Sequence, residues 1–168
     1  MRFSRATFEA SCEACAEVLR LDHPADGVLS GFFRNRPELG RQDRSLIAET
    51  VYAVLRRKRL LEFVLEGRAI RQVVLAAWAI LLGANMREIE ALARPADARR
   101  IGDAKQRAHG ELPLEVACDL PDWLVAPLKA QLGDEFMPLA EAQKPVTGLS
   151  LVIRMPMVLT MRQPPKSV

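Results

Sequence analysis

Three cysteines and two histidines carry the most reactive side chains of this chain, and their spacing indicates neither a metal site nor a catalytic one. Cys12 and Cys15 form a C-x-x-C pair inside a stretch with helical periodicity, whereas structural zinc needs four ligands, usually in spaced pairs. Cys118, His23 and His109 are scattered, and neither histidine has a Ser, Cys or carboxylate partner at a spacing typical of acid–base chemistry. We therefore expect small core cysteines and exposed turn histidines.

Positive charge is the feature from which a binding function can be argued. There is no glycine-rich loop of the GxGxxG or GxxxxGK[ST] type, so no nucleotide or cofactor site is predicted. A run of four cations occupies positions 56–59, and such a cluster is typical of contact with the phosphates of a structured RNA. The candidate RNA-binding residues are Arg41, Arg44, Arg56, Arg57, Lys58 and Arg59, with Arg34 and Arg36 just upstream, and no catalytic or metal residue is predicted.

The same charges have a second interpretation, which charge alone does not separate from the first. They can form a solvated helix face with ion pairs to neighbouring acids. Tyr52 and Phe63 are expected to face inward, so stacking of unpaired bases is not supported. The acids available for ion pairs are Glu38, Asp43, Glu49 and Glu62.

The basic run must be positioned by the most strongly periodic stretch of the chain, residues 43–67. Its apolar residues recur at three- and four-residue steps, which predicts one helix of roughly 36 Å at about 1.5 Å per residue, with Asp43 as N-cap and Gly67 as C-cap. Consecutive residues fan around a helix by about 100°, so one cation of the run must cross the apolar stripe. Lys58 is expected to do so, with its aliphatic stem over the core.

The remaining chain is predicted to be helical up to Pro145, and the fold class is therefore all-α. The central element is the helix of residues 68–83, which is apolar almost all round. Pro121 begins a later helix, in which Trp123, Leu124 and Leu128 are expected to face inward. Further helices are expected at 7–21, from Asp26 to before Pro37, at 86–93 with Asn85 as cap, at 97–107 and from Gly133 to near Lys144, and one or two strands at 149–160.

Charge divides the chain into three segments. Residues 1–110 contain 19 Lys and Arg against 14 Asp and Glu, residues 111–148 contain 2 against 7, and residues 149–168 contain 3 against none. We interpret these segments as a basic helical domain, a helical linker and a tail, with the polyanion-facing surface on the first. No apolar run reaches the ~18 residues that span a bilayer, and no secretion signal is recognised, so we expect a cytoplasmic protein without a membrane partner.

Two blocks carry a resemblance to a known family. The block DRSLIAETVYAVLR, with the basic residues after it, resembles the pattern D-R-x-x-[IL]-x-E-x-V-Y-x-V-L-R of the NusB-like N-terminal domain of bacterial ribosomal RNA cytosine-5 methyltransferases, the RsmB/Sun family. The later LPDWLVAPLKAQLGDEFMPLAEAQ resembles the linker helices of that family. The resemblance covers residues 25–148. It implies a NusB-like helical bundle whose partner is ribosomal RNA, with no DNA expected.

The resemblance stops before the catalytic part of that family. The segment from Leu149 departs from the family strand L-x-L-R-[VI]-N, and a frame change or truncation near Leu151 is our hypothesis for the tail. The domain that binds S-adenosylmethionine and the two catalytic cysteines have no counterpart here, so an RNA-positioning module without methyl transfer of its own is expected. Its own missing methyltransferase domain is then a possible partner. The alternative is a stand-alone NusB-like domain for transcription antitermination or protein interaction, docking through residues 112–142.

Overall fold

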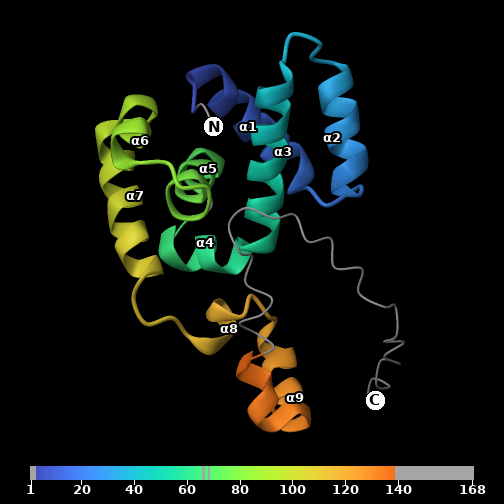
Figure 1. Ribbon diagram of the computed structural model, residues 1–168, viewed down its shortest axis with the longest axis vertical. Helices are drawn as coiled ribbons and strands as arrows, with labels where there is room; N and C mark the ends of the chain where they lie inside the picture. The colour runs from blue at the N-terminus through green and yellow to red at the C-terminus, as the bar shows by residue number, and fades with distance from the viewer. Residues whose placement is uncertain (1–2, 66, 68, 139–168) are drawn as a thin grey trace, which may run out of the picture.

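The computed structural model describes residues 3–65, 67 and 69–138, and this part of the chain contains helices and no strand (Figure 1). The all-α prediction is confirmed at this level, while the predicted strands at 149–160 lie outside the described residues. The α-helices are α1 Arg5–Val18, α2 Ala25–Arg34, α3 Arg41–Arg56, α4 Lys58–Leu65, α5 Ile70–Ala76, α6 Met86–Leu92, α7 Pro95–Ala108, α8 Leu114–Ala117 and α9 Asp122–Leu132; η1 Ala77–Leu81 is a π-helix and η2 Gly133–Glu135 a 3-10 helix.

Helix α5 lies at the centre of a bundle made by α1–α7, as its apolar sequence predicted (Figure 1). Every residue from Val73 to Ala79 is buried, and Trp78 is fully enclosed. The indole N–H of Trp78 donates to Thr50 Oγ1 at 2.7 Å, and the Thr50 hydroxyl donates to the Leu46 carbonyl at 2.7 Å. The indole N–H and the Thr50 hydroxyl are thereby both satisfied, which removes most of the cost of burying these two groups. Phe8 from α1 packs edge-on against the same indole.

The helix predicted over 68–83 begins at Ile70 and changes to a π-helical turn at Ala77. A π-turn contains one more residue than an α-turn. The segment ends at Gly83, whose φ of +76° is a conformation that glycine adopts without a steric penalty. The Ala84 N–H then donates to the Trp78 carbonyl at 2.9 Å, which closes the end of the element.

The single long helix predicted over 43–67 is wrong. The chain forms α3 and α4, which are separated at Arg57, where φ is −114° and ψ is 28°. Gly40, and not Asp43, is the N-cap of α3. Asp43 instead accepts a hydrogen bond from the Thr7 hydroxyl at 2.9 Å and so joins α3 to α1. Its carboxylate is used for a contact between helices, which sequence spacing does not reveal.

Local capping signals were read correctly at one helix and incorrectly at another. Asn85 caps α6, and Glu88 completes a capping box, with both hydrogen bonds at 2.9 Å. In α2 the N-cap is Pro24, and Asp26 lies in the first turn. There Asp26 accepts a hydrogen bond from the Tyr52 hydroxyl of α3, so it too joins two helices.

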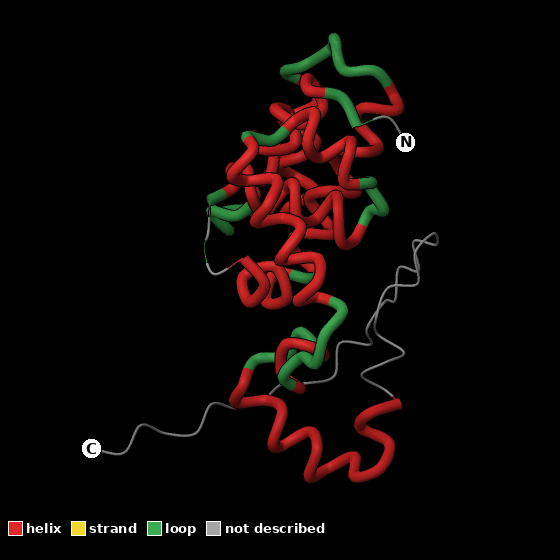
Figure 2. Tube along the Cα trace, turned by 90° about the vertical axis from the view of Figure 1, so that its left-hand side faces the viewer, coloured by secondary structure: helices red, strands yellow, loops and turns green. Residues whose placement is uncertain are grey.

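Residues 111–138, here called the arm, contain α8, α9 and η2 and lie beyond α4 at one end of the bundle (Figure 2). Val116 of α8 is buried in a small apolar cluster with Leu60 and Val64 of α4 and Ala104 of α7. Helix α9 has no buried residue. Trp123 was predicted to face inward, but its side chain is 69% exposed, because nothing covers that side of α9 within the described residues.

Candidate nucleic-acid interface

Arg57, one of the six predicted RNA-binding residues, is largely withdrawn from solvent. Its guanidinium forms an ion pair with Asp119 of the arm, and the two side chains are 13% and 14% exposed. It also donates to the Ala117 carbonyl at 3.4 Å. The prediction that Lys58 crosses the apolar stripe is therefore wrong. Lys58 is exposed and pairs with Glu62 one turn along α4 at 2.6 Å, because the break at residue 57 turns Arg57, not Lys58, toward the arm.

Asp119 lies against the first turn of α4, where backbone N–H groups have no partner inside the helix. Burial raises the pKa of Asp119, while the Arg57 guanidinium and the backbone N–H groups of Leu60 and Arg59 lower it by a smaller amount. Neither carboxylate oxygen completes a hydrogen bond of regular geometry, so the contact is mainly one of charge. Asp119 has a φ of +52°, which Asp tolerates better than most residues. The carboxylate thus lies at the point where α3 ends and α4 begins.

Arg59 carries a second contact with the arm. Its guanidinium meets the carboxylate of Asp122, at the start of α9, at 2.5 Å. The Arg59 side chain is 31% exposed and the Asp122 side chain 78% exposed. This pair is therefore much more exposed to solvent than the pair between Arg57 and Asp119, and water and salt screen its charges.

Arg44 is occupied by the backbone of the loop between α2 and α3. It donates to the Leu39 carbonyl at 2.8 Å and to the Arg36 carbonyl at 3.3 Å, and its guanidinium lies 5.8 Å from the centre of the Phe33 ring. Arg36 is itself paired with Glu13 at 2.6 Å. These two arginines fix the α2–α3 loop, and the structure does not leave them free for a ligand.

Arg41 and Arg56 remain, and both are exposed. Within the described part of the chain neither has an acidic partner, and Arg56 only donates to the Tyr52 carbonyl of its own helix at 3.3 Å. They stand at the two ends of α3, roughly 22 Å apart at about 1.5 Å per residue. Arg34, at the end of α2, is exposed as well.

The ion pairs suggested by the alternative interpretation form in only one of four cases. Glu62 binds Lys58, but among the described residues Glu38, Asp43 and Glu49 pair with none of the six cations. Their place is taken by Asp119 and Asp122, about 60 residues further along the chain. Neither acid is recognisable from the sequence as a partner of the basic run, since no local spacing connects them to it.

The cysteine prediction is confirmed. Cys12 and Cys15 are buried in the main core, and burial raises the pKa of each thiol to about 12. His23 and His109 are exposed, and His109 Nδ1 lies 2.7 Å from the Lys105 carbonyl at the end of α7. The described residues contain no group of three or more His, Cys, Asp or Glu side chains able to hold a metal ion.

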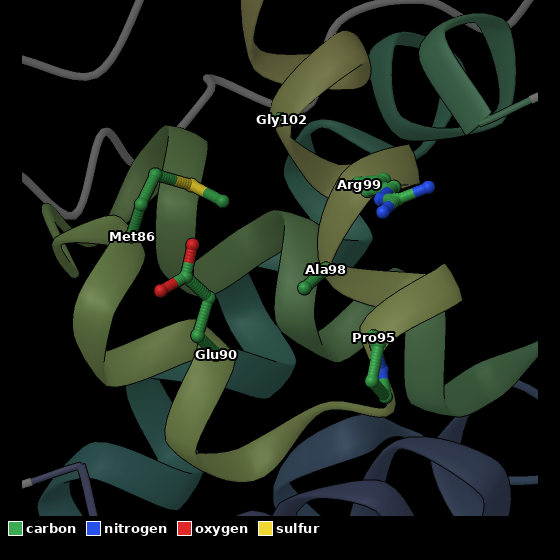
Figure 3. A pocket seen from close by; sticks show the side chains of 6 residues that line it. All are labelled: Met86, Glu90, Pro95, Ala98, Arg99 and Gly102. Carbon is green, nitrogen blue, oxygen red and sulfur yellow. The ribbon is translucent and has the colours of Figure 1, made fainter.

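One hollow of about 430 Å³ lies between α6 and α7 (Figure 3). Met86 and Glu90 line one side, and residues of α7, among them Arg99, line the other. It offers one carboxylate and one guanidinium at an open, mostly apolar surface, without a cysteine, histidine or hydroxyl among its lining residues. We assign it no reaction.

Aromatic exposure also differs from the prediction. Phe63 of α4 is 41% exposed rather than inward, while Tyr52 is half-buried beside Asp26. Phe63 on α4 and Trp123 on α9 are therefore both exposed apolar side chains, although periodicity predicted that both would face the core.

Comparison with models of protein families, with curated proteins and with solved structures finds no match to this chain. No helix in the described part of the chain has the length and hydrophobicity that crossing a bilayer requires.

Proposed function

We propose that the chain is an RNA-binding module that positions ribosomal RNA, with phosphate contacts made by Arg41 and Arg56. The observation that carries this proposal is their exposure at the two ends of α3 without an acidic partner among the described residues. An unpaired arginine on a rigid helix can exchange its hydration for a phosphate without first breaking an ion pair. Arg34 extends the same basic surface toward α2.

The role proposed for these contacts is positioning. Phosphate contacts supply affinity and orientation but read little sequence, so the module would hold an RNA while a catalytic domain acts on it. The resemblance to the NusB-like domain of ribosomal RNA cytosine-5 methyltransferases supplies the kind of RNA and the kind of reaction. The methyl transfer itself, with S-adenosylmethionine, is assigned to a domain of that family that has no counterpart among these residues.

The proposal is tested by replacing both arginines in the full chain. Arg41→Ala with Arg56→Ala should weaken binding to a ribosomal RNA hairpin and reduce the slope of log affinity against log salt by up to about 2 units, roughly one per lost phosphate contact. The matched control is Arg87→Ala with Arg100→Ala, which removes the same charge from exposed positions on α6 and α7, on the other side of the bundle (Figure 1). Circular dichroism confirms that each variant is folded. Equal effects of the two pairs would contradict the proposal.

A second candidate function is protein interaction through the arm. Trp123 and Met137 are 69% and 45% exposed, and α9 buries none of its residues. Exposed large apolar side chains on one element are typical of a surface that another protein covers. RNA affinity that is undetectable in the wild-type chain, or indifferent to Arg41 and Arg56, would favour this function over the first.

A further inference from the structure

We propose that the arm lowers the affinity for RNA, because the Asp122 carboxylate binds the Arg59 guanidinium in the place of an RNA phosphate. The inference rests on the proposed function, since it concerns the same basic surface. It assigns the run at positions 56–59 two different tasks: Arg57 anchors the arm permanently, and Arg59 is covered by a carboxylate that an RNA can displace.

The anchoring half of the arm is α8 and the turn after it. Val116 is buried among side chains of α4 and α7, and Asp119 is held by Arg57 in a pair that is almost closed to water. An RNA phosphate reaching Arg57 would have to leave Asp119 charged, buried and unpaired, which is strongly unfavourable. Arg57 is thus removed from the RNA-binding set, and α8 stays docked.

The displaceable half begins at Asp122. The turn from Asp119 to Pro121 carries this carboxylate to Arg59, but the helix that follows has no buried residue to hold it there. The Asp122 side chain is 78% exposed, so water can solvate it when it leaves Arg59. A phosphate offers Arg59 a bidentate contact and releases counterions from the RNA, which a single exposed aspartate does not.

The distribution of charge along the chain favours competition between Asp122 and an RNA phosphate for Arg59. The segment 111–148 holds 7 acidic residues against 2 basic ones and follows a basic segment directly. Because the arm is tethered beside Arg59, its effective concentration is high, and the apparent affinity for RNA falls by the fraction of molecules in which Asp122 is in place. We therefore expect that a ligand with little negative charge does not displace Asp122 from Arg59.

The test replaces Asp122 in the full chain and measures binding of a ribosomal RNA hairpin at several salt concentrations. Asp122→Asn should raise the affinity roughly two- to fivefold, the range expected for releasing one exposed ion pair, and steepen the salt slope by about one unit. The control is Asp134→Asn, which makes the same change of charge in the same arm at an exposed carboxylate that has no partner among the described residues. Asp134→Asn should change both quantities much less.

Replacement of Arg59 completes the test. Arg59→Ala should weaken RNA binding less in the wild-type chain, where the cost of breaking the pair with Asp122 offsets the phosphate contact, than in the Asp122→Asn background, where it should abolish the gain. Equal gains for Asp122→Asn and Asp134→Asn, or a gain that survives Arg59→Ala, would overturn the inference while leaving the role of Arg41 and Arg56 intact. If the wild-type chain binds no RNA, or if Arg41→Ala with Arg56→Ala has no effect, the proposed function fails and the inference fails with it.

Discussion

The α1–α7 bundle and the arm differ in what holds their helices in place, and the two tryptophans of the chain make the difference plain. Trp78 is fully buried at the centre of the bundle and donates a hydrogen bond to Thr50. Trp123 lies on α9 with 69% of its side chain exposed. The bundle is stabilised by a continuous apolar core. The described part of the arm has two buried apolar side chains, Val116 and Phe136, and two of its carboxylates pair with the basic run at positions 56–59.

Helix α9 can therefore leave Arg59 while the bundle stays folded and α8 stays docked. Local opening needs little free energy where few apolar contacts are lost, and close to the whole free energy of unfolding where a core residue is exposed. Three measurements extend or contradict this comparison.

Thiol labelling should give the largest contrast. Burial raises the pKa of Cys12 and Cys15 to about 12, so at neutral pH they are protonated as well as inaccessible. Cys118 lies in the arm and is partly exposed. We expect Cys118 to react with a thiol reagent at least about a thousandfold faster than the other two, since exposing them requires most of the ~5–15 kcal/mol of global stability. Cys118→Ser should leave only slow labelling; rapid modification of Cys12 in that variant would show that α1 is loosely packed.

The tryptophans should respond very differently to truncation. Trp78→Ala leaves a cavity in the core and should lower the free energy of unfolding by about 3–5 kcal/mol in urea denaturation. Trp123→Ala should change it by less than about 0.5 kcal/mol, because an exposed side chain loses little burial. A loss above about 2 kcal/mol for Trp123→Ala would mean that α9 packs against part of the chain.

The smallest difference is expected between the free energies of unfolding lost when each of the two ion pairs between the basic run and the arm is broken. Arg57→Ala leaves Asp119 buried without its cation and should cost about 3 kcal/mol, the lower end of the range for breaking a buried pair. Arg59→Ala removes an exposed pair and should cost less than about 1 kcal/mol. Chemical denaturation followed by circular dichroism measures both; similar costs would contradict the division of the run into an anchor and a covered residue.

Apolar periodicity predicted most of the helices and the buried centre correctly. It succeeded where a segment such as 73–79 is apolar on every side, and the residue type alone identified the local cap at Asn85. It failed at Trp123, because periodicity identifies an apolar face but not whether anything packs on it. Elsewhere in the arm, Val116 and Phe136 are buried.

The candidate site was harder to predict for a related reason. The sequence identified the cations, but which of them are free depends on carboxylates far away in the chain. Asp119 pairs with Arg57 where α3 meets α4, and Asp122 pairs with Arg59. Of the six cations, only Arg41 and Arg56 are exposed without an acidic partner among the described residues.

The separation of Arg59 and Asp122 in the sequence also means that the two residues are synthesised at different times. The two residues are 63 positions apart, and a ribosome adds about 5–20 residues per second, so roughly 3–13 s pass between their syntheses. During that interval the run at positions 56–59 has neither of its carboxylates from the arm. A nascent chain is thus more basic at this point than the finished protein, beside a particle made largely of RNA. The order in which the chain is made, and not only its final fold, decides when this charge is covered.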